Sequence, residues 1–393
     1  MRLIKKLSTG WLLFACAASF NSYAMPSARK ADMDAVVKNA AEDAMRQHGI
    51  PGLAIAIAAG GEQWFYSYGV ASKKTEQKIT EDTIFEIGSV SKTFTATLAT
   101  YAQAKGQLSL TDSPGKYLPQ LRGTSLDKVT LVNLGTHTAG GFPLQVPDAI
   151  GNTGQLMDYF KAWQPAHVAG TERSYANPSI GMLGVVVAKS MQMPFEEAME
   201  QQLFRRLGMF DSFINVPAGK MPLYAQGYNR NDEPVRVNPG VLAAEAYGVK
   251  TSAKDLIRFV EANMGLISLE EKLQRAITGT HTGYYKLGAM TQDLIWEQYS
   301  YPATLNALLE GNSAKMALES HAVVELKSPQ PPQKEVWINK TGSTNGFGAY
   351  VAFVPAKKIG IVVLANKNYP NESRVRLAHQ IIEQLDCCAR ARH

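Results

Sequence analysis

The placement of strand-forming segments at both ends of the chain constrains its fold most. Near the start, GLAIAIAA (52–59), two glycines and an alternating segment at 63–68 predict a β-hairpin. Near the end stand three segments rich in β-branched and aromatic residues, at 335–339, 349–353 and 359–364. A helical pattern lies outside each group, at 32–47 and 375–385. We predict a mixed α/β (α+β) fold whose antiparallel sheet combines N- and C-terminal segments and is flanked by helices.

Between these ends the hydrophobic pattern is mostly helical. The predicted helices are 93–104, 131–138, 155–163, 180–191, 195–207 and 254–263. No fixed-period repeat, low-complexity segment or Pro/Gly/Ser-rich linker divides the chain. We therefore expect residues 25–393 to form one domain of two lobes, the sheet and an inserted, mostly helical lobe, with a site at the seam between them.

The first 24 residues have the pattern of a cleaved signal peptide. A basic start (Arg2, Lys5, Lys6) precedes an apolar run through Phe20 and the small-x-small end Ser22-Tyr23-Ala24. The alternative, a lipoprotein cleavage site at Cys16, is disfavoured by the bulky Phe14. We expect cleavage after Ala24 and export to the periplasm without a membrane anchor.

Charge and cysteine content exclude some functions. Removal of the three basic signal residues lowers the net charge from +6 to +3, and no run of basic residues interleaved with aromatics follows, so we expect no nucleic-acid partner. Cys387 and Cys388 are sequence neighbours, which form a poor, strained disulfide, so the exported fold depends on packing. A monomer is the simplest expectation.

A serine and a lysine begin the helical segment that follows FEIG. The pattern Ser-x-x-Lys occurs four times, but only Ser89 and Lys92 open an apolar helix after a strand-like segment. Residues three apart share a helix face, so the amine can take the serine proton if burial lowers its pKa. The pair predicts an activated nucleophile. The alternative is that Ser89 caps the helix and Lys92 extends to solvent.

Two further groups of residues are suited to the same chemistry. Tyr175 and Asn177 lie in SYANP (174–178), a loop before a helix, and a phenol is a base at neutral pH only if cations stabilise its phenolate. The alternative is a packed tyrosine beside a turn-forming asparagine. Lys340-Thr341-Gly342-Ser343 ends a predicted strand and can hold a carboxylate, admit a close backbone and aim an N–H at an oxyanion. Its alternative is a solvated lysine before a glycine turn.

These three motifs, in this order, resemble those of the serine β-lactamase and penicillin-binding-protein superfamily. Longer strings are similar to those of the class C β-lactamases, the cephalosporinases. This resemblance implies a β-lactamase/transpeptidase-like fold and β-lactam substrates. These strings are FEIGSVSKTF (85–94), HTAGGFPLQVPD (137–148), AEAYGVK (244–250), KTGSTNGFGAYVAFVP (340–355) and LANKNYPNESRV (364–375).

The resemblance also implies a role for each matching position. Ser89 is the acylated nucleophile, Lys92 its proton partner and Tyr175 the base, while the Ser89 and Ser343 amides form an oxyanion hole. The implied substrate contacts are Gln145 and Asn177 at the side-chain amide, Tyr247 as a wall, and Lys340, Thr341, Asn371 and Arg374 at the carboxylate end.

The chain departs from the family pattern in two places. The family commonly has Tyr-Gln-Gly-Leu-Gly-Trp where this chain has TQDLIW (291–296), and often has glycine where Asn345 stands. These departures leave the preferred cephalosporins open.

Other mechanisms lack their motifs in this sequence. The seven histidines form neither His-x-His-x-Asp nor His-Glu-x-x-His, and no Gly-x-Ser-x-Gly surrounds Ser89, so we expect no metal, no cofactor and no α/β-hydrolase. Two alternatives stay open. One is a DD-peptidase or esterase with the same serine, lysine and tyrosine; the other is a sensor that is acylated without turnover.

Overall fold

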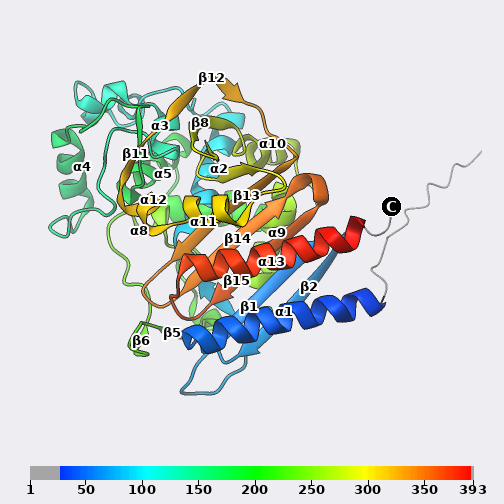
Figure 1. Cartoon of the computed structure of the whole chain (residues 1–393). Coiled ribbons are helices and arrows are strands. Elements are labelled where there is room, and N and C mark those ends of the chain that lie inside the picture. Colours follow the sequence, from blue (N-terminus) through cyan, green and yellow to red (C-terminus); the bar gives the residue numbers. More distant parts are fainter. Residues whose placement is uncertain (1–26, 391–393) are drawn as a thin grey trace, which may run out of the picture.

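The computed structural model describes residues 27–390, and within them nine strands form one antiparallel sheet (Figure 1). The strand order, with bounds, is β12 (Val324–Gln330), β8 (Gly283–Leu287), β9 (Met290–Asp293), β10 (Glu297–Ser300), β13 (Val336–Ser343), β14 (Gly348–Val354), β15 (Ile359–Ala365), β1 (Gly52–Ala59) and β2 (Glu62–Gly69).

The two ends of the chain meet inside this sheet. Strand β1 pairs with β2 on one side and with β15 on the other, so that Ile55 lies opposite both Tyr66 and Val363. The hairpin turn between β1 and β2 uses Gly60 and Gly61, whose φ angles of 63° and 84° are left-handed. The prediction of a sheet built from both termini is confirmed.

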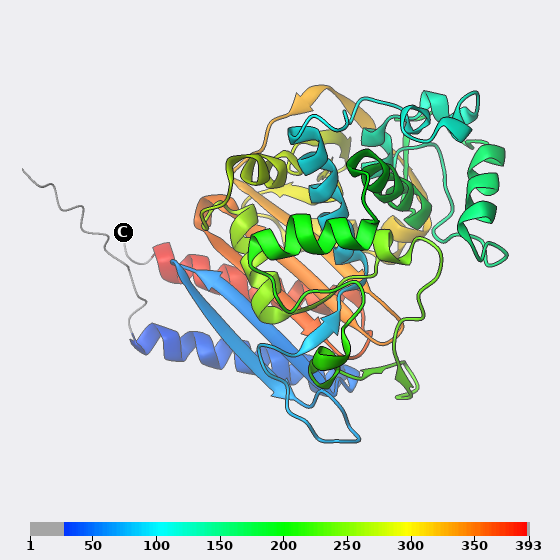
Figure 2. The same ribbon diagram turned by 180° about the vertical axis from the view of Figure 1, so that it is seen from behind.

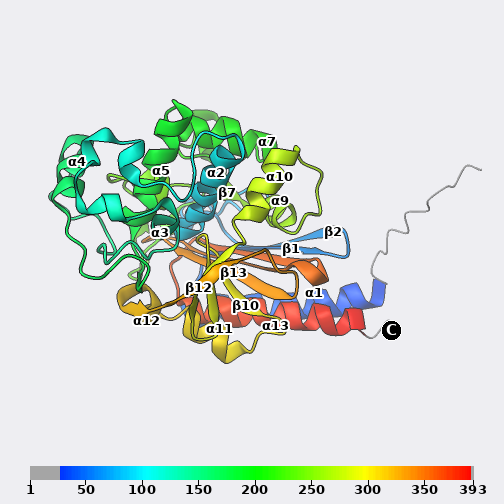
Figure 3. The same cartoon turned by 90° about the horizontal axis from the view of Figure 1, so that it is seen from above.

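Helices cover both faces of the sheet, as the view from above shows (Figure 3). The helices α1 (Ser27–His48) and α13 (Asn371–Arg390) lie side by side on one face. On the other face lie α2 (Ser91–Ala104), α9 (Ala253–Asn263) and α10 (Glu271–Gly279), with further segments from the middle of the chain (Figure 2).

The alternation of residues along β1 explains why both faces are covered. Leu53, Ile55 and Ile57 belong to the core under α1 and α13. Ala54, Ala56 and Ala58 belong to the core on the opposite face, where their small side chains let α9 approach closely. Every residue of β1 is buried, so the strand is apolar on both sides.

The remaining helices and short strands connect these layers. The other helices are α3 (Leu131–Gly135), α4 (Thr153–Ala162), α5 (Asn177–Met191), α6 (Phe195–Glu197), α7 (Arg205–Leu207), α8 (Ala243–Ala246), α11 (Leu305–Gly311) and α12 (Ala314–Leu318). The short strands pair as β3 (Ile84–Glu86) with β7 (Lys250–Ser252), β4 (Glu172–Ser174) with β11 (Ser320–Ala322), and β5 (Gly227–Tyr228) with β6 (Pro234–Val235).

Several sequence-based boundaries need correction. The predicted helix at 195–207 is interrupted, because Ala198–Phe204 is π-helical between α6 and α7. The strand predicted at 335–339 continues to Ser343 in the structure, where it is β13. The Lys-Thr-Gly residues therefore lie within this strand and not after it. The signal peptide predicted at 1–24 lies outside the described residues. Among residues 27–390, no helix is both long and apolar enough to cross a membrane.

Candidate active site

Ser89 lies in a 3₁₀ turn, Gly88–Val90, that leads from β3 into α2. Its side chain makes no capping hydrogen bond in either the turn or the helix, so the capping alternative is wrong. Lys92, one turn further on, is fully buried and donates from Nζ to Ser89 Oγ at 2.8 Å and to the Ala246 carbonyl at 2.9 Å. The alternative in which Lys92 reaches solvent is therefore also wrong.

Burial of α2 on all sides is what places Lys92 in the interior. Its threonines satisfy their hydroxyl groups locally; Thr93 and Thr97, for example, donate to the carbonyls of Val90 and Thr93. A lysine in this setting loses its hydration, and burial lowers the pKa of Lys92 to about 8. The amine can therefore exchange a proton with Ser89 near neutral pH.

Tyr175 lies in the connection between β4 and α5, and three cations surround its ring. The Lys340 and Lys92 Nζ atoms are 5.0 Å and 5.2 Å from the ring centroid, and Arg173 Cζ is 5.4 Å away. Burial raises the pKa of the phenol. Lys340, Lys92 and a hydrogen bond with Ser89 lower it by more than burial raises it, so that the pKa is about 8. These cations supply the phenolate stabilisation that a tyrosine base requires.

The end of β13 packs backbone to backbone against the Ser89 turn. A Cβ atom on Gly342 would lie 2.0 Å from the Ile87 carbonyl oxygen and 3.0 Å from the Ser89 nitrogen, so only glycine allows this approach. Strand β10 pairs with β13 only as far as Asn339. The edge of β13 beyond that residue therefore has no strand partner on this side and borders a cavity.

This cavity has a volume of about 520 Å³ and collects most of the residues that the sequence singled out. It is lined by Ser89, Gln145, Tyr175, Asn177, Tyr247, Lys340, Thr341, Ser343 and Asn371. Asn177 donates from Nδ2 to Gln145 Oε1 at 2.7 Å, which links two residues expected to act together. Lys92 lies behind the wall, in contact with Ser89.

A known family of enzymes matches nearly the whole of the described chain. The Beta-lactamase family model matches residues 37–386. This chain belongs to the β-lactamase family. A β-lactamase from Lysobacter lactamgenus is 53% identical over 380 residues, which are 97% of this chain and 98% of that protein.

Solved structures of similar β-lactamases agree over the same span. A β-lactamase/D-alanine carboxypeptidase from Pseudomonas syringae is 59% identical, with a TM-score of 0.88 over 90% of this chain and 99% of that one. A class C β-lactamase in complex with cefoxitin is 51% identical, with the same TM-score and coverage. The resemblance to class C β-lactamases and to their fold is confirmed.

The position of Arg374 corrects one expectation about this β-lactamase. Arg374 does not line the cavity, because it is fully buried and its guanidinium is engaged by the protein. It donates to the Gly342 carbonyl at 2.7 Å, to Ser343 Oγ at 2.9 Å and to Asn368 Oδ1 at 2.9 Å. Its contacts hold the end of β13 and do not leave the guanidinium free for a carboxylate.

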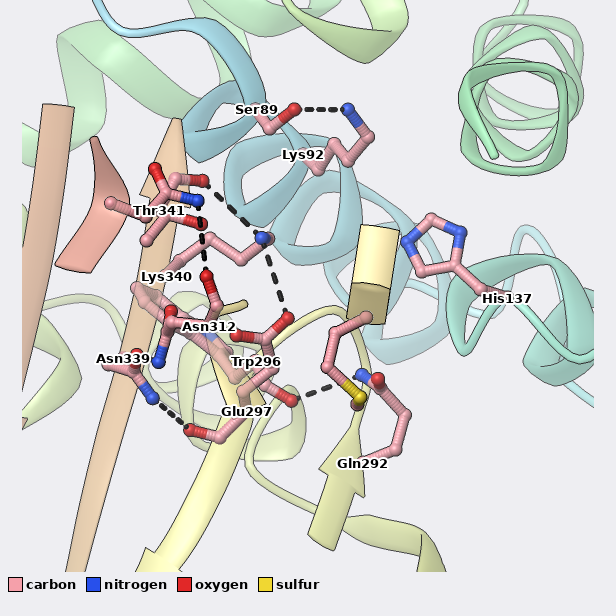
Figure 4. A network of polar contacts seen from close by, with 12 residues as sticks. Ser89, Lys92, His137, Gln292, Trp296, Glu297, Asn312, Asn339, Lys340 and Thr341 are labelled. Atoms are coloured by element: carbon pink, nitrogen blue, oxygen red, sulfur yellow. Dashed lines mark hydrogen bonds and ion pairs between the residues drawn. The ribbon is translucent and has the colours of Figure 1, made fainter. Parts of the chain in front are cut away.

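An ion-pair network beside the cavity escaped the sequence analysis. The Glu297 Oε1 atom lies 3.2 Å from Arg173 Nη2 and 3.6 Å from Lys340 Nζ, and all three side chains are buried. Arg173 Nε also donates to Gln292 Oε1 at 2.6 Å. In Figure 4, Lys340 lies between the Ser89–Lys92 pair and Glu297. The network joins β4, β9, β10 and β13, and no local sequence pattern marks such long-range partners.

The departure at 291–296 covers the last three residues of β9 and the turn that leads to β10. Asp293 is buried, and neither carboxyl oxygen has a hydrogen-bond partner among the described residues. Burial raises the pKa of Asp293 well above its usual value, and Lys286 offsets this only in part. Ile295 adopts a left-handed φ of 71°, which is costly for a β-branched residue. Asp293 and Ile295, the two positions at which the resemblance led us to expect glycine, are thus desolvated and strained, respectively.

No group of three or more His, Cys, Asp or Glu side chains within residues 27–390 is arranged to hold a metal ion.

Proposed function

We propose that this chain hydrolyses the β-lactam amide of cephalosporins and penicillins through an acyl-enzyme on Ser89, and so confers antibiotic resistance. One observation carries the proposal. A serine hydroxyl accepts a 2.8 Å hydrogen bond from a buried lysine, and a phenol beside it lies within about 5 Å of two ammonium groups. Membership of the β-lactamase family supplies the substrate class.

In acylation, Ser89 Oγ attacks the β-lactam carbonyl carbon. Its proton passes to the Lys92 and Tyr175 pair, and from there to the ring nitrogen as the amide bond breaks. The negative charge that develops on the carbonyl oxygen is stabilised by the backbone amides of Ser89 and Ser343. The contact of Gly342 and Gly88 with the opposite backbone supports this role, because it brings the two amides to one side of the cavity.

In deacylation, water attacks the ester carbonyl while Tyr175 takes its proton. The ester C–O bond then breaks, and Ser89 Oγ regains a proton from the same pair. The pKa of about 8 for both Tyr175 and Lys92 supports these roles, because each group can both accept and release a proton near neutral pH.

We assign the remaining cavity residues to substrate binding. Lys340 and Thr341 face the substrate carboxylate, with Asn371 at the same end, while Gln145 and Asn177 hydrogen-bond the side-chain amide and Tyr247 forms a wall. Arg374 acts indirectly, since it holds Ser343 and the Gly342 carbonyl in place. We further propose that the protein is exported to the periplasm after cleavage at Ala24 and that residues 25–393 act as a single, monomeric two-lobed domain.

The test is whether the acyl-enzyme turns over. Slowing deacylation by a factor of about 10⁵ requires only about 7 kcal/mol of extra barrier, so short motifs do not distinguish a β-lactamase from a DD-peptidase or a sensor. Catalytic amounts of the protein should bleach an excess of chromogenic cephalosporin. Bleaching of a single equivalent would contradict the proposal.

The names of similar proteins favour a second activity. The structure from Pseudomonas syringae is described as both a β-lactamase and a D-alanine carboxypeptidase. Release of D-alanine from a peptide ending in D-Ala-D-Ala, measured beside cephalosporin turnover, tests whether this chain shares both activities. Slow peptide release with fast cephalosporin turnover would leave the β-lactamase as the main function.

A further inference from the structure

His137 is a buried histidine that the proposed mechanism does not use. It follows α3 and has only 1% of its surface exposed. Its ring centroid lies 4.4 Å from that of Tyr175, with the ring planes tilted by 43°. Figure 4 shows the imidazole of His137 pointing toward the region of Lys92 and Lys340.

His137 also holds the backbone on both sides of Tyr175. Its carbonyl oxygen accepts from the Ser174 amide at 2.9 Å, and its Nδ1 accepts from the Ala176 amide at 3.2 Å. The residues immediately before and after the phenol are thus bound to one residue. The backbone of His137 adopts a left-handed φ of 60°, a conformation that histidine and asparagine tolerate better than most residues.

These contacts determine the protonation state of the ring. A backbone amide is always a donor, so Nδ1 must be unprotonated and the single ring proton is on Nε2. Nε2 itself is buried without a hydrogen-bond partner among the described residues. The charged groups around the ring come from three elements: Arg173 from β4, Lys92 from α2 and Lys340 from β13, with the Tyr175 phenol against its face.

A second proton on His137 is therefore strongly disfavoured. It would break the Ala176 hydrogen bond and add a fourth positive charge beside Arg173, Lys92 and Lys340. Burial, followed by these three cations, lowers the pKa of His137 well below its usual value. The imidazole stays neutral over the pH range in which Lys92 and Tyr175 exchange protons.

We propose that His137 is a positioning residue that fixes the Tyr175 phenol between Ser89 and the two lysines, through its carbonyl oxygen and Nδ1. This inference rests on the proposed role of Tyr175 as the base. A displacement of about 1 Å in a reacting group can reduce the rate by about 10²-fold, so loss of this clamp affects catalysis directly. The role is distinct from packing, because it depends on a hydrogen-bond acceptor at the Nδ1 position.

Three variants separate the acceptor from the ring. His137→Asn keeps a hydrogen-bond acceptor near the Nδ1 position and tolerates the left-handed backbone. His137→Phe keeps an aromatic ring without the acceptor. His137→Gly removes both the ring and the acceptor but suits the φ angle, so it should fold even if His137→Phe does not. The matched control is His379→Phe, a buried histidine on α13 that contacts Trp337.

The readouts are kcat/KM for a chromogenic cephalosporin from pH 5 to 10 and the melting temperature. We expect His137→Asn to stay within about threefold of wild type with the same pH midpoint. His137→Phe and His137→Gly should lose about tenfold to 10²-fold, with the midpoint moved upward because the phenol leaves the two ammonium groups. His379→Phe should alter the melting temperature alone.

Two results would overturn the inference. One is a wild-type rate and midpoint in a folded His137→Phe or His137→Gly variant. The other is a loss in His137→Asn as large as in His137→Gly, which would mean that only ring packing counts. Tyr175→Phe, measured in parallel, separates this inference from the proposed function. Full activity in Tyr175→Phe would contradict the role of Tyr175 as the base. An inactive Tyr175→Phe beside an unaffected His137→Phe would contradict the role of His137 alone.

Discussion

At the scale of single residues, the site depends on the burial of Lys92. An exposed lysine three residues after a serine would remain protonated and could not accept the serine's proton. Here the Lys92 amine is buried and donates hydrogen bonds to Ser89 Oγ and to the Ala246 carbonyl oxygen. Burial lowers its pKa to about 8. The same burial that activates the amine makes it sensitive to pH.

Replacing Lys92 by methionine should separate its contributions to catalysis and stability. We expect Lys92→Met to reduce kcat/KM by about 10²- to 10⁴-fold, the usual contribution of an acid–base group. Folded Lys92 releases its proton near pH 8, whereas an unfolded lysine holds it to about pH 10.4, so the unfolded state binds more protons between these values. The free energy of unfolding of wild type should therefore rise with pH across this window relative to Lys92→Met.

Urea unfolding at several pH values between 7 and 10 measures this difference. Tyr175 contributes with the same sign, because its folded pKa of about 8 is also below the ordinary phenol value. Parallel pH dependences for the wild type and Lys92→Met would show that the amine keeps its ordinary pKa.

The sequence motifs pointed to residues that line the cavity, but not to the residues that hold them in place. Ser89, Tyr175 and Lys340 carry functional groups in recognisable motifs, and the structure brings them to one cavity. Arg173 and Glu297 were not identified because they pair with each other across 124 positions of sequence. Arg374 was assigned to the substrate, since no pattern revealed that backbone carbonyls engage its guanidinium.

At the scale of elements, the contact between β13 and the Ser89 turn sets the geometry of the cavity. We expect Gly342→Ala to lower kcat/KM by about 10²-fold, because its Cβ would lie 2.0 Å from the Ile87 carbonyl oxygen and push the strand from the turn. Gly219→Ala is the matched control, since a Cβ there meets no atom within 4 Å. Steady-state kinetics of both variants should show the loss in the first only; equal rates would mean that the turn and β13 can separate without harm.

The hairpin of β9 and β10 was not predicted from the sequence, and its composition explains why. Thr291, Gln292, Asp293, Glu297 and Gln298 are polar and yet buried, so this part of the sheet lacks the hydrophobic pattern of a strand. By contrast, β1 and β15 are apolar throughout and were recognised within one residue of their bounds. Hydrophobic periodicity does not identify strands whose buried side chains are polar, as they are here next to the cavity.

Asp293 should destabilise this hairpin at neutral pH. Its folded pKa is raised well above the ordinary value of about 3.9, so between these values the folded state holds a proton that the unfolded state releases. The free energy of unfolding then falls as pH rises. We expect Asp293→Asn to be more stable than wild type at pH 7 and to converge with it near pH 4.

Thermal or urea unfolding of Asp293→Asn from pH 4 to 8 tests this expectation. The control is Asp158→Asn, because Asp158 is exposed on α4 and forms a surface ion pair with Lys161. If Asp293→Asn and wild type kept a constant difference over the whole range, Asp293 would not be held protonated.

At the scale of the whole molecule, three distant segments meet at one cavity. The Ser89 turn follows β3, Tyr175 follows β4, and Lys340 lies on β13, in a sheet that joins the two ends of the chain. The sheet's origin from both termini was predictable because the neighbouring strands β14, β15 and β1 are buried and predominantly apolar. How closely the three segments approach one another at the cavity depends on tertiary packing, such as the glycine contacts between β13 and the Ser89 turn. Their spacing in the sequence does not encode this approach.

The hydrolysis rate of Ser89→Ala tests this account most directly. With the hydroxyl gone, Lys92 and Tyr175 have no nucleophile to activate, so bleaching of a chromogenic cephalosporin should fall by about 10⁴-fold or more. The melting temperature should stay close to wild type, since Ser89 is half-buried and caps no helix. A folded Ser89→Ala protein that retained turnover within about tenfold of wild type would contradict the claim that this serine is the nucleophile.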